Sequence, residues 1–86
     1  MLSASKAAER AVEHVTALTG RSAESVVGVE RAGEDAWRVA VEVVETHRIP
    51  DSADILAVYD TEVDADGELV AFRRARRYPR GRVERD

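Results

Sequence analysis

The sequence predicts an α+β fold in which one N-terminal helix packs on a four-stranded antiparallel sheet. Three observations support this prediction. Apolar residues recur every three or four positions over about residues 4–19, which is the period of a helix. Apolar and polar residues then alternate in four later segments, as in strands that have one face in water. Turn-forming sequences separate these segments, so an α-β-β-β-β meander is the simplest arrangement.

The predicted helix has an apolar stripe built mostly of alanine. The hydroxyl of Ser3 or Ser5 can cap its first turn, and Gly20 can take the left-handed conformation that follows a last turn. Because the stripe is thin, we expect the helix to lie close to the sheet. The stripe consists of Ala4, Ala8, Ala11, Val12, Val15 and Leu18.

Four strands are predicted, at about residues 25–31, 36–47, 54–63 and 68–78. Gly28 inside the first strand favours a bulge. The second strand alternates most clearly, and its apolar face consists of Trp37, Val39, Val41 and Val43. We expect the helix to cover this face, with Trp37 as a core anchor, although Trp37 as an interface anchor is an alternative. A rival apolar patch consists of Leu56, Val58, Val70 and Phe72.

The third strand presents Ile55, Ala57, Tyr59, Thr61 and Val63 on one face, and a DADG turn joins it to the fourth strand. If Val63 pairs with Leu69, simple alternation places the later residues of the fourth strand. Ala71, Arg73, Ala75 and Arg77 then lie on one face, and Val70, Phe72, Arg74, Arg76 and Tyr78 on the other. In this register Asp60 and Glu62 share a face with Arg74 and Arg76, which favours pairing of opposite charges.

Length and composition indicate one domain, residues 1–80, followed by a flexible tail, residues 81–86. The chain has no cysteine, and its apolar runs are too short to span a bilayer, so we expect a soluble intracellular protein. The net charge is −4, and it is unevenly distributed. Residues 1–68 carry 15 acids and 6 bases, whereas residues 69–86 carry 7 arginines and 2 acids.

Motifs for catalysis or metal binding are not found in the sequence. His14 and His47 are isolated, and we expect both on the surface without a metal. Asp64 and Asp66 lie in a turn and lack the other ligands of a calcium loop. We therefore expect no cofactor, no metal and no enzymatic activity.

The arginine cluster near the C-terminus is the most distinctive feature. Three interpretations are open: pairing with carboxylates of the same chain, contact with another protein, or contact with nucleic acid. The acidic remainder of the chain disfavours nucleic acid, because it repels phosphates. The cluster consists of Arg73, Arg74, Arg76, Arg77 and Arg80, with Phe72 and Tyr78 between them.

Beyond these patterns, the chain resembles a known family over residues 8 to about 81. The segments that carry the resemblance are EVVETHRIPDSADILAVYDTEVDADGEL and the closing RRARRY. They are similar to the gas vesicle protein O (GvpO) family of actinobacteria and haloarchaea. The order of helix and strands also looks like the PepSY type of small domain, in architecture only. The GvpO resemblance implies a non-enzymatic accessory protein, needed for gas vesicle formation and located in the cytoplasm with the vesicles.

The resulting hypothesis is an assembly factor that contacts other gas vesicle proteins. The alternative is a small nucleic-acid-binding regulator of gas vesicle genes that uses the arginine cluster. A third hypothesis is a homodimer in which the first or fourth strand pairs with its copy. The charge of the chain disfavours nucleic acid as a partner, and no membrane partner is expected. The expected contact surface consists of Arg73, Arg74, Arg76, Arg77 and Tyr78, together with Ile49, Pro50 and Asp51 of a loop.

Overall fold

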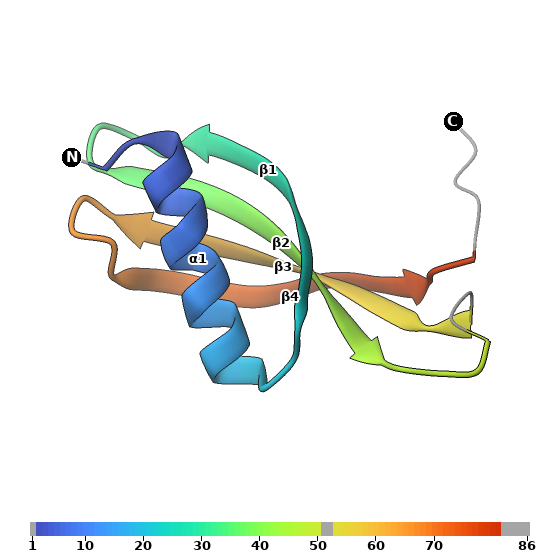
Figure 1. Cartoon of the computed structure of the whole chain (residues 1–86). Helices are drawn as coiled ribbons and strands as arrows, with labels where there is room; N and C mark the ends of the chain where they lie inside the picture. The colour runs from blue at the N-terminus through green and yellow to red at the C-terminus, as the bar shows by residue number, and fades with distance from the viewer. Residues whose placement is uncertain (1, 51–52, 82–86) are drawn as a thin grey trace, which may run out of the picture.

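The computed structural model describes residues 2–50 and 53–81 and has one helix packed on one face of a four-stranded sheet (Figure 1). The strands lie in the order β1-β2-β3-β4, and each neighbouring pair is antiparallel. The predicted α+β class and meander are therefore confirmed. The PepSY likeness and the single domain stay predictions, and the predicted tail lies outside the described residues except for Gly81. The elements are α1 (Ala4–Thr19), β1 (Ala23–Arg31), β2 (Ala36–Thr46), β3 (Ile55–Asp64) and β4 (Leu69–Pro79).

Both ends of α1 are capped by local hydrogen bonds. The hydroxyl of Ser3, not that of Ser5, accepts a hydrogen bond from the backbone N–H of Lys6 at 3.2 Å. At the other end Gly20 has φ of 69°, and its N–H donates to the carbonyl of Thr16 at 2.9 Å. These bonds satisfy backbone groups that have no partner inside the helix, so the helix begins and ends where the sequence predicts.

The buried row of α1 differs from the predicted stripe. Ala7, Ala11 and Val15 are fully buried, whereas Leu18 is 58% exposed and Ala4 is also exposed. The three buried residues are spaced by four, so they form one row along the helix. Ala8 and Val12 are half-buried and pack beside this row. The predicted stripe was therefore correct in its middle but extended too far at both ends.

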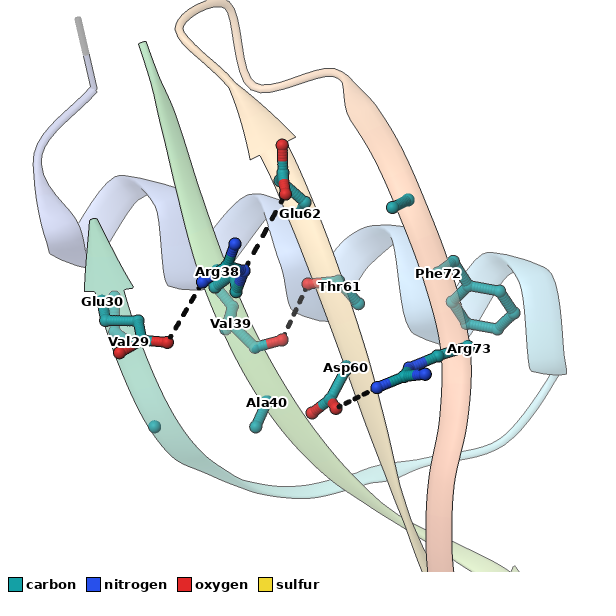
Figure 2. A pocket seen from close by; sticks show the side chains of 12 residues that line it. Val29, Glu30, Arg38, Val39, Ala40, Asp60, Thr61, Glu62, Phe72 and Arg73 are labelled. Carbon is teal, nitrogen blue, oxygen red and sulfur yellow. Dashed lines mark hydrogen bonds and ion pairs between the residues drawn. The ribbon is translucent and has the colours of Figure 1, made fainter. Parts of the chain in front are cut away.

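The core lies between α1 and the face of the sheet that carries the valines of β2. Val39, Val41 and Val43 are at most 1% exposed and pack with Ala57 and Val63 of β3. Trp37 packs at the edge of this core, and its indole N–H donates to the carbonyl of Leu2 at 3.1 Å. The helix therefore covers the Trp37 face, as expected. The opposite face, with Arg38 and Asp60 among its side chains, points away from α1 (Figure 2).

Two β-bulges in β4 overturn part of the predicted register. Val63 does pair with Leu69, but Glu62 then pairs with Ala71, so Val70 is an extra residue. A second irregularity makes Ala75 an extra residue between Arg74, opposite Tyr59, and Arg76, opposite Val58. Each extra residue shifts the alternation by one and sends the next side chains to the other face. Arg73, Arg76 and Tyr78 therefore share the open face with Asp60, whereas Phe72, Arg74 and Arg77 lie on the helix face.

The corrected register removes the rival apolar patch. Phe72 turns towards α1 and stacks on Tyr59, with 5.0 Å between ring centroids and 7° between planes. Val70 projects from the bulge and is 58% exposed. Leu56 and Val58 remain on the open face, but each is only 4% exposed. Their neighbours on that face, described below, cover them.

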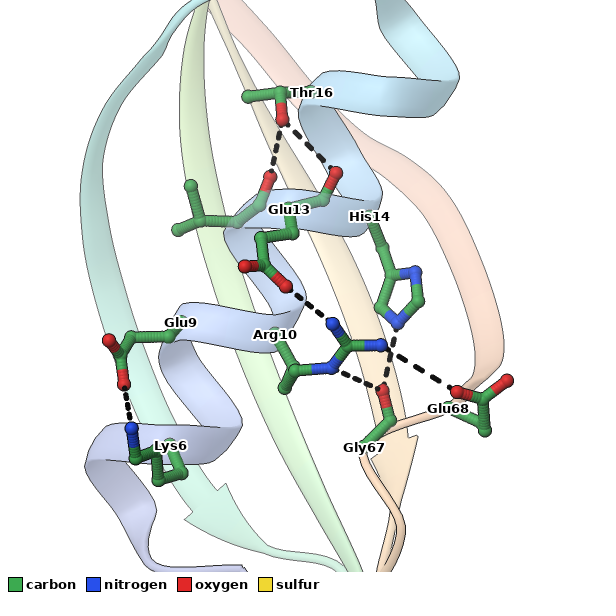
Figure 3. A network of polar contacts seen from close by, with 9 residues as sticks. Lys6, Glu9, Arg10, Glu13, His14, Thr16, Gly67 and Glu68 are labelled. Carbon is green, nitrogen blue, oxygen red and sulfur yellow. Dashed lines mark hydrogen bonds and ion pairs between the residues drawn. The ribbon is translucent and has the colours of Figure 1, made fainter.

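The turn between β3 and β4 is tied to the helix (Figure 3). The side chain of Asp64 accepts hydrogen bonds from the backbone N–H groups of Asp66 and Glu68 at 2.9 and 3.0 Å, which confirms the turn interpretation. The carbonyl oxygen of Gly67 accepts a hydrogen bond from Arg10 Nε at 3.2 Å and lies 2.9 Å from His14 Nε2. His14 is therefore not a plain surface residue as predicted, because it joins α1 to this turn.

Replacing Phe72 tests the corrected register. We expect Phe72→Ala to lower the free energy of unfolding by about 2 kcal/mol, because it removes a stacked ring from the edge of the core. The matched change Val70→Ala is expected to cost less than about 0.5 kcal/mol, because Val70 is exposed. Urea unfolding followed by tryptophan fluorescence measures both values. Equal losses would contradict the bulge.

Gly67 offers a second stability test, with Gly33 as its control. Both glycines have positive φ, 82° and 79°, so alanine at either position costs about 1 kcal/mol of backbone strain. A Cβ at Gly67 would also lie 3.0 Å from Arg10 Cγ, whereas one at Gly33 meets nothing within 4 Å. We therefore expect Gly67→Ala to lower the melting temperature more than Gly33→Ala. A larger effect at Gly33 would contradict the packing described here.

Candidate protein-interaction surface

One end of the sheet extends beyond the helix. The end of β2, the start of β3 and the end of β4 project past α1 (Figure 1). The loop that contains Ile49 and Pro50 joins β2 to β3 at this end, and Ile49 is 100% exposed. The basic part of β4 runs along the same end. Because no helix covers it, side chains of the strands themselves must cover the sheet here.

On the helix face, two arginines of β4 meet one glutamate of β2. Arg74 Nη1 lies 3.0 Å from Glu45 Oε2, and Arg77 Nε lies 2.9 Å from Glu45 Oε1. The side chain of Glu45 is only 9% exposed. Strands β2 and β4 are not neighbours, so these pairs cross β3 above Ala57, which is fully buried and whose short side chain leaves room for them. Both arginines thus link β4 to β2 across β3.

On the open face, the end of β4 reaches back across the sheet in the same way. The hydroxyl of Tyr78 donates to the carboxylate of Glu42 on β2. Arg80 pairs with Glu24 of β1, at the opposite edge of the sheet. These side chains span the part of the open face where Leu56 pairs with Tyr78, which accounts for the burial of Leu56.

Asp54 connects the β2–β3 loop to the end of β4. Its carboxylate accepts the backbone N–H of Arg48 at 2.7 Å and lies 3.3 Å from both His47 Nδ1 and Arg80 Nη2. The hydrogen bond from Arg48 lowers the pKa of Asp54, His47 and Arg80 add to this, and burial of the carboxylate opposes them. The side chain of His47 is 76% exposed, which agrees with its predicted surface position.

Arg73 and Arg76 are the arginines of β4 that remain most available on the open face. The side chain of Arg73 is 80% exposed, with its guanidinium 3.9 Å from Asp60. The guanidinium of Arg76 lies over the ring of Tyr78, 5.7 Å from the centroid. Among residues 2–50 and 53–81, no carboxylate forms an ion pair with Arg76. A partner could therefore bind Arg76 without breaking an ion pair described here.

A hollow of about 470 Å³ adjoins Arg73 on the open face (Figure 2). Small residues Gly28, Ala40 and Ala71 line it, so the centre of the face is low. Charged side chains stand around them. Glu30, Arg38 and Glu62 follow one another across three strands, with Arg38 3.7 Å from Glu30 and 4.0 Å from Glu62. The hollow thus presents both signs of charge close together.

The structure divides the predicted contact residues into two groups. Arg73, Arg76 and Tyr78 share the open face, whereas Arg74 and Arg77 face the other way and are held by Glu45. Ile49 and Pro50 lie in the exposed loop at the end of the sheet, and Asp51 lies outside the described residues.

Sequence reasoning missed the carboxylates that hold β4. Glu42 and Glu45 stand out as acids within an apolar strand, and this was the available signal. Glu24 and Asp54 carried no such signal, because each lies at a strand end where an acid is unremarkable.

The described residues contain no group of three or more histidines, cysteines, aspartates or glutamates placed to hold a metal ion. No helix in this part of the chain is long and apolar enough to cross a membrane. A helix on one side of the sheet and a hollow with mixed charges on the other define a small α+β protein with an exposed, charged sheet face.

Comparison with known proteins identifies the family to which this chain belongs. The chain belongs to the gas vesicle synthesis protein GvpO family, whose model matches residues 1–84. It is 54% identical over 68 residues to gas vesicle protein O of Streptomyces sp. (strain CB03234), which covers 79% of this chain and 52% of that protein. No solved structure matches the chain significantly.

Two archaeal relatives extend this comparison. Gas vesicle protein O of Haloferax mediterranei is 34% identical over 82 residues, which cover 95% of this chain and 59% of the relative. Gas vesicle protein O1 of Halobacterium salinarum is 32% identical over 82 residues, which cover 68% of that protein. The chain thus spans between about half and two thirds of the relatives it matches.

Acidification tests the role of Asp54. Its lowered pKa means that the ionised carboxylate stabilises the fold above pH 4 or so, and that this stabilisation is lost as the pH falls through the folded-state pKa. We therefore expect Asp54→Asn to lower the free energy of unfolding at neutral pH, with a difference from the parent that shrinks in acid. Urea unfolding across pH measures this difference. Asp66→Asn, an exposed turn residue, is the charge-matched control, and a pH-independent loss for Asp54→Asn would contradict the assignment.

Proposed function

We propose that this chain is a non-enzymatic accessory protein needed for gas vesicle formation, which acts as an assembly factor by binding other gas vesicle proteins. Membership of the GvpO family, with a match over nearly the whole chain, is the observation that carries the proposal. Three relatives named gas vesicle protein O or O1 support it. We place its action in the cytoplasm, in association with the vesicles.

The contact surface that we propose is the open face of the sheet, with Arg73 and Arg76 at its β4 side and the loop at Ile49 and Pro50 beyond its end. Arg76 supports this choice because it is aligned on an aromatic ring yet has no ion-pair partner among the described residues. The hollow beside Arg73 supports it because a projecting side chain of a partner can enter there. Arg74 and Arg77 contribute indirectly, by holding β4 in place.

The mixed charges of this face favour a protein partner over nucleic acid. Glu30, Asp60 and Glu62 stand beside the arginines and would repel a phosphate backbone. A protein surface can present basic groups to these acids and acidic groups to Arg73 and Arg76. The regulator hypothesis is therefore not favoured.

Arg76→Glu tests the surface in vesicle-forming cells. We expect the tagged protein to retain other gas vesicle proteins in a pull-down read by mass spectrometry, and the variant to lose most of them. The expected loss is tenfold or so, since reversing one contact charge costs about 1.4 kcal/mol or more. Arg76 is chosen over Arg74 because Arg74→Glu would set a second carboxylate against Glu45 and disturb the fold.

Lys6→Glu is the control for this experiment. It makes the same change in charge at an exposed helix position, where Lys6 forms only a surface ion pair with Glu9. Each pull-down is repeated after nuclease treatment, and thermal unfolding verifies that both variants are folded. Retention of all partners by a folded Arg76→Glu variant would exclude this surface. Loss of the partners on nuclease treatment would instead support the nucleic-acid alternative.

A further inference from the structure

The free edge of β1 is the most exposed regular element of the structure. After Ala23, every residue of this nine-residue strand is exposed, and only β2 pairs with it. Its outer edge therefore presents backbone N–H and C=O groups that no other described strand uses. Such an edge is a template on which a further strand can pair.

The two edges of the sheet differ in how they resist pairing. The β4 edge carries four arginines, two bulges and Pro79, which are the usual means of blocking a free edge. The β1 edge is also interrupted by two bulges, at Glu24 and Val27, but it has neither lysine nor proline. It carries three exposed valines: Val26 at 38%, Val27 at 51% and Val29 at 36%. The β1 edge is thus the less protected of the two edges.

The apolar surface continues from β1 onto the helix. Val26 and Val29 pair with Val41 and Val39 of β2, so both lie on the helix face. Beside Val26, a shallow groove is lined by Ala8, Val12 and two glutamates of α1. An apolar band therefore runs along the outside of the molecule, and a monomer leaves it in water.

We propose that a second copy of this chain covers this band, with the two β1 strands paired antiparallel about a two-fold axis. One register pairs the valines of the helix face, with Val27 as the extra residue of a bulge in each strand and Gly28 opposite its copy. It sets Val26 opposite Val29 of the second copy, and by symmetry Val29 opposite Val26. Because both valines lie on the helix face in each copy, the paired side chains meet on the same side of the joined sheet. The helices of the two copies then lie on one face.

The charged residues of β1 do not oppose this register, because Glu24 pairs with Arg80 and Glu30 with Arg38 inside each copy. The glutamates of the groove do not oppose this arrangement, because Glu9 pairs with Lys6 and Glu13 with Arg10 inside each copy. Self-complementarity of the apolar positions is what a two-fold interface requires. This self-match favours a second copy over an unrelated extended segment.

The mass in solution tests the proposal. We expect the 9.5 kDa chain to show a concentration-dependent shift from monomer to dimer in sedimentation velocity. Val26→Lys combined with Val29→Lys should weaken the dimer by at least tenfold, by setting like charges opposite each other. Val70→Lys, an exposed valine of the other edge strand, should leave it unchanged. A chain that stays monomeric at every concentration would overturn the proposal and leave the edge to a segment of another protein.

Disulfide trapping tests the register and does not depend on the lysine variants folding. The chain has no cysteine, so Val26→Cys and Val29→Cys each introduce a single thiol. In the proposed register these two positions face each other, at a spacing that a disulfide can bridge with small adjustment. Mixing the two variants under oxidising conditions should trap a dimer several times more than either variant alone. Equal trapping in all three samples would overturn the register.

The test is independent of the proposed function. The dimer uses the β1 edge, whereas the partner surface uses the open face and the β4 side of the sheet. Failure of the pull-down with a clear dimer in solution would reject the partner surface alone. A monomer that still retains gas vesicle proteins would reject the dimer alone.

Discussion

Two extra residues in β4, Val70 and Ala75, decide on which side of the sheet the side chains between them lie. A strand without them would turn Phe72 to the open face and Arg73 to the helix face. With them, Phe72 joins the core and stacks on Tyr59, while Arg73 emerges on the open face. The two shifts cancel after Ala75, so Arg76 lies on the open face in either case. The place of Arg73 in the candidate contact surface therefore depends on a backbone irregularity and not on side-chain chemistry alone.

Most of the described arginines near the C-terminus form ion pairs with carboxylates of the same chain. Arg74 and Arg77 converge on Glu45, and Arg80 reaches Glu24 at the far edge of the sheet. Exposed ion pairs usually contribute little, about 0–1 kcal/mol each. Here, however, the side chain of Glu45 is largely buried, so removing its partners would leave a carboxylate poorly solvated. These ion pairs join the basic residues at the end of β4 to acidic residues of β1 and β2.

The molecule has three surfaces of different composition. The helix face of the sheet is closed by the alanine and valine row of α1 over β2 and β3. The open face carries acids and arginines around small residues, which suits contact with a charged protein surface. The β1 edge carries three exposed valines and lacks the arginine cluster and the proline of the β4 edge. Since the open face and the β1 edge do not overlap, a dimer joined at β1 would present two open faces on the side away from the helices.

The sequence by itself determined the element order, the helix bounds, the Trp37 face as the core and the turn at Asp64. Each of these follows from local patterns: helical periodicity, strand alternation, and capping or turn residues at the ends. The family resemblance, and with it the link to gas vesicles, also came from the sequence and was confirmed by comparison. These properties involve neighbours along the chain, which is why pattern reasoning reaches them.

Only the tertiary structure decided which arginines contact the largely buried Glu45 and which remain available on the open face. That division depends on bulges that have no clear residue signature and on contacts such as Arg77 with Glu45, which span 32 positions in the sequence. It also decided that Leu56 and Val58 are covered while the valines of β1 are not, because burial depends on what crosses each face. Alternation tells which residues share a face of a strand, but it does not tell where that alternation is interrupted or what lies above it.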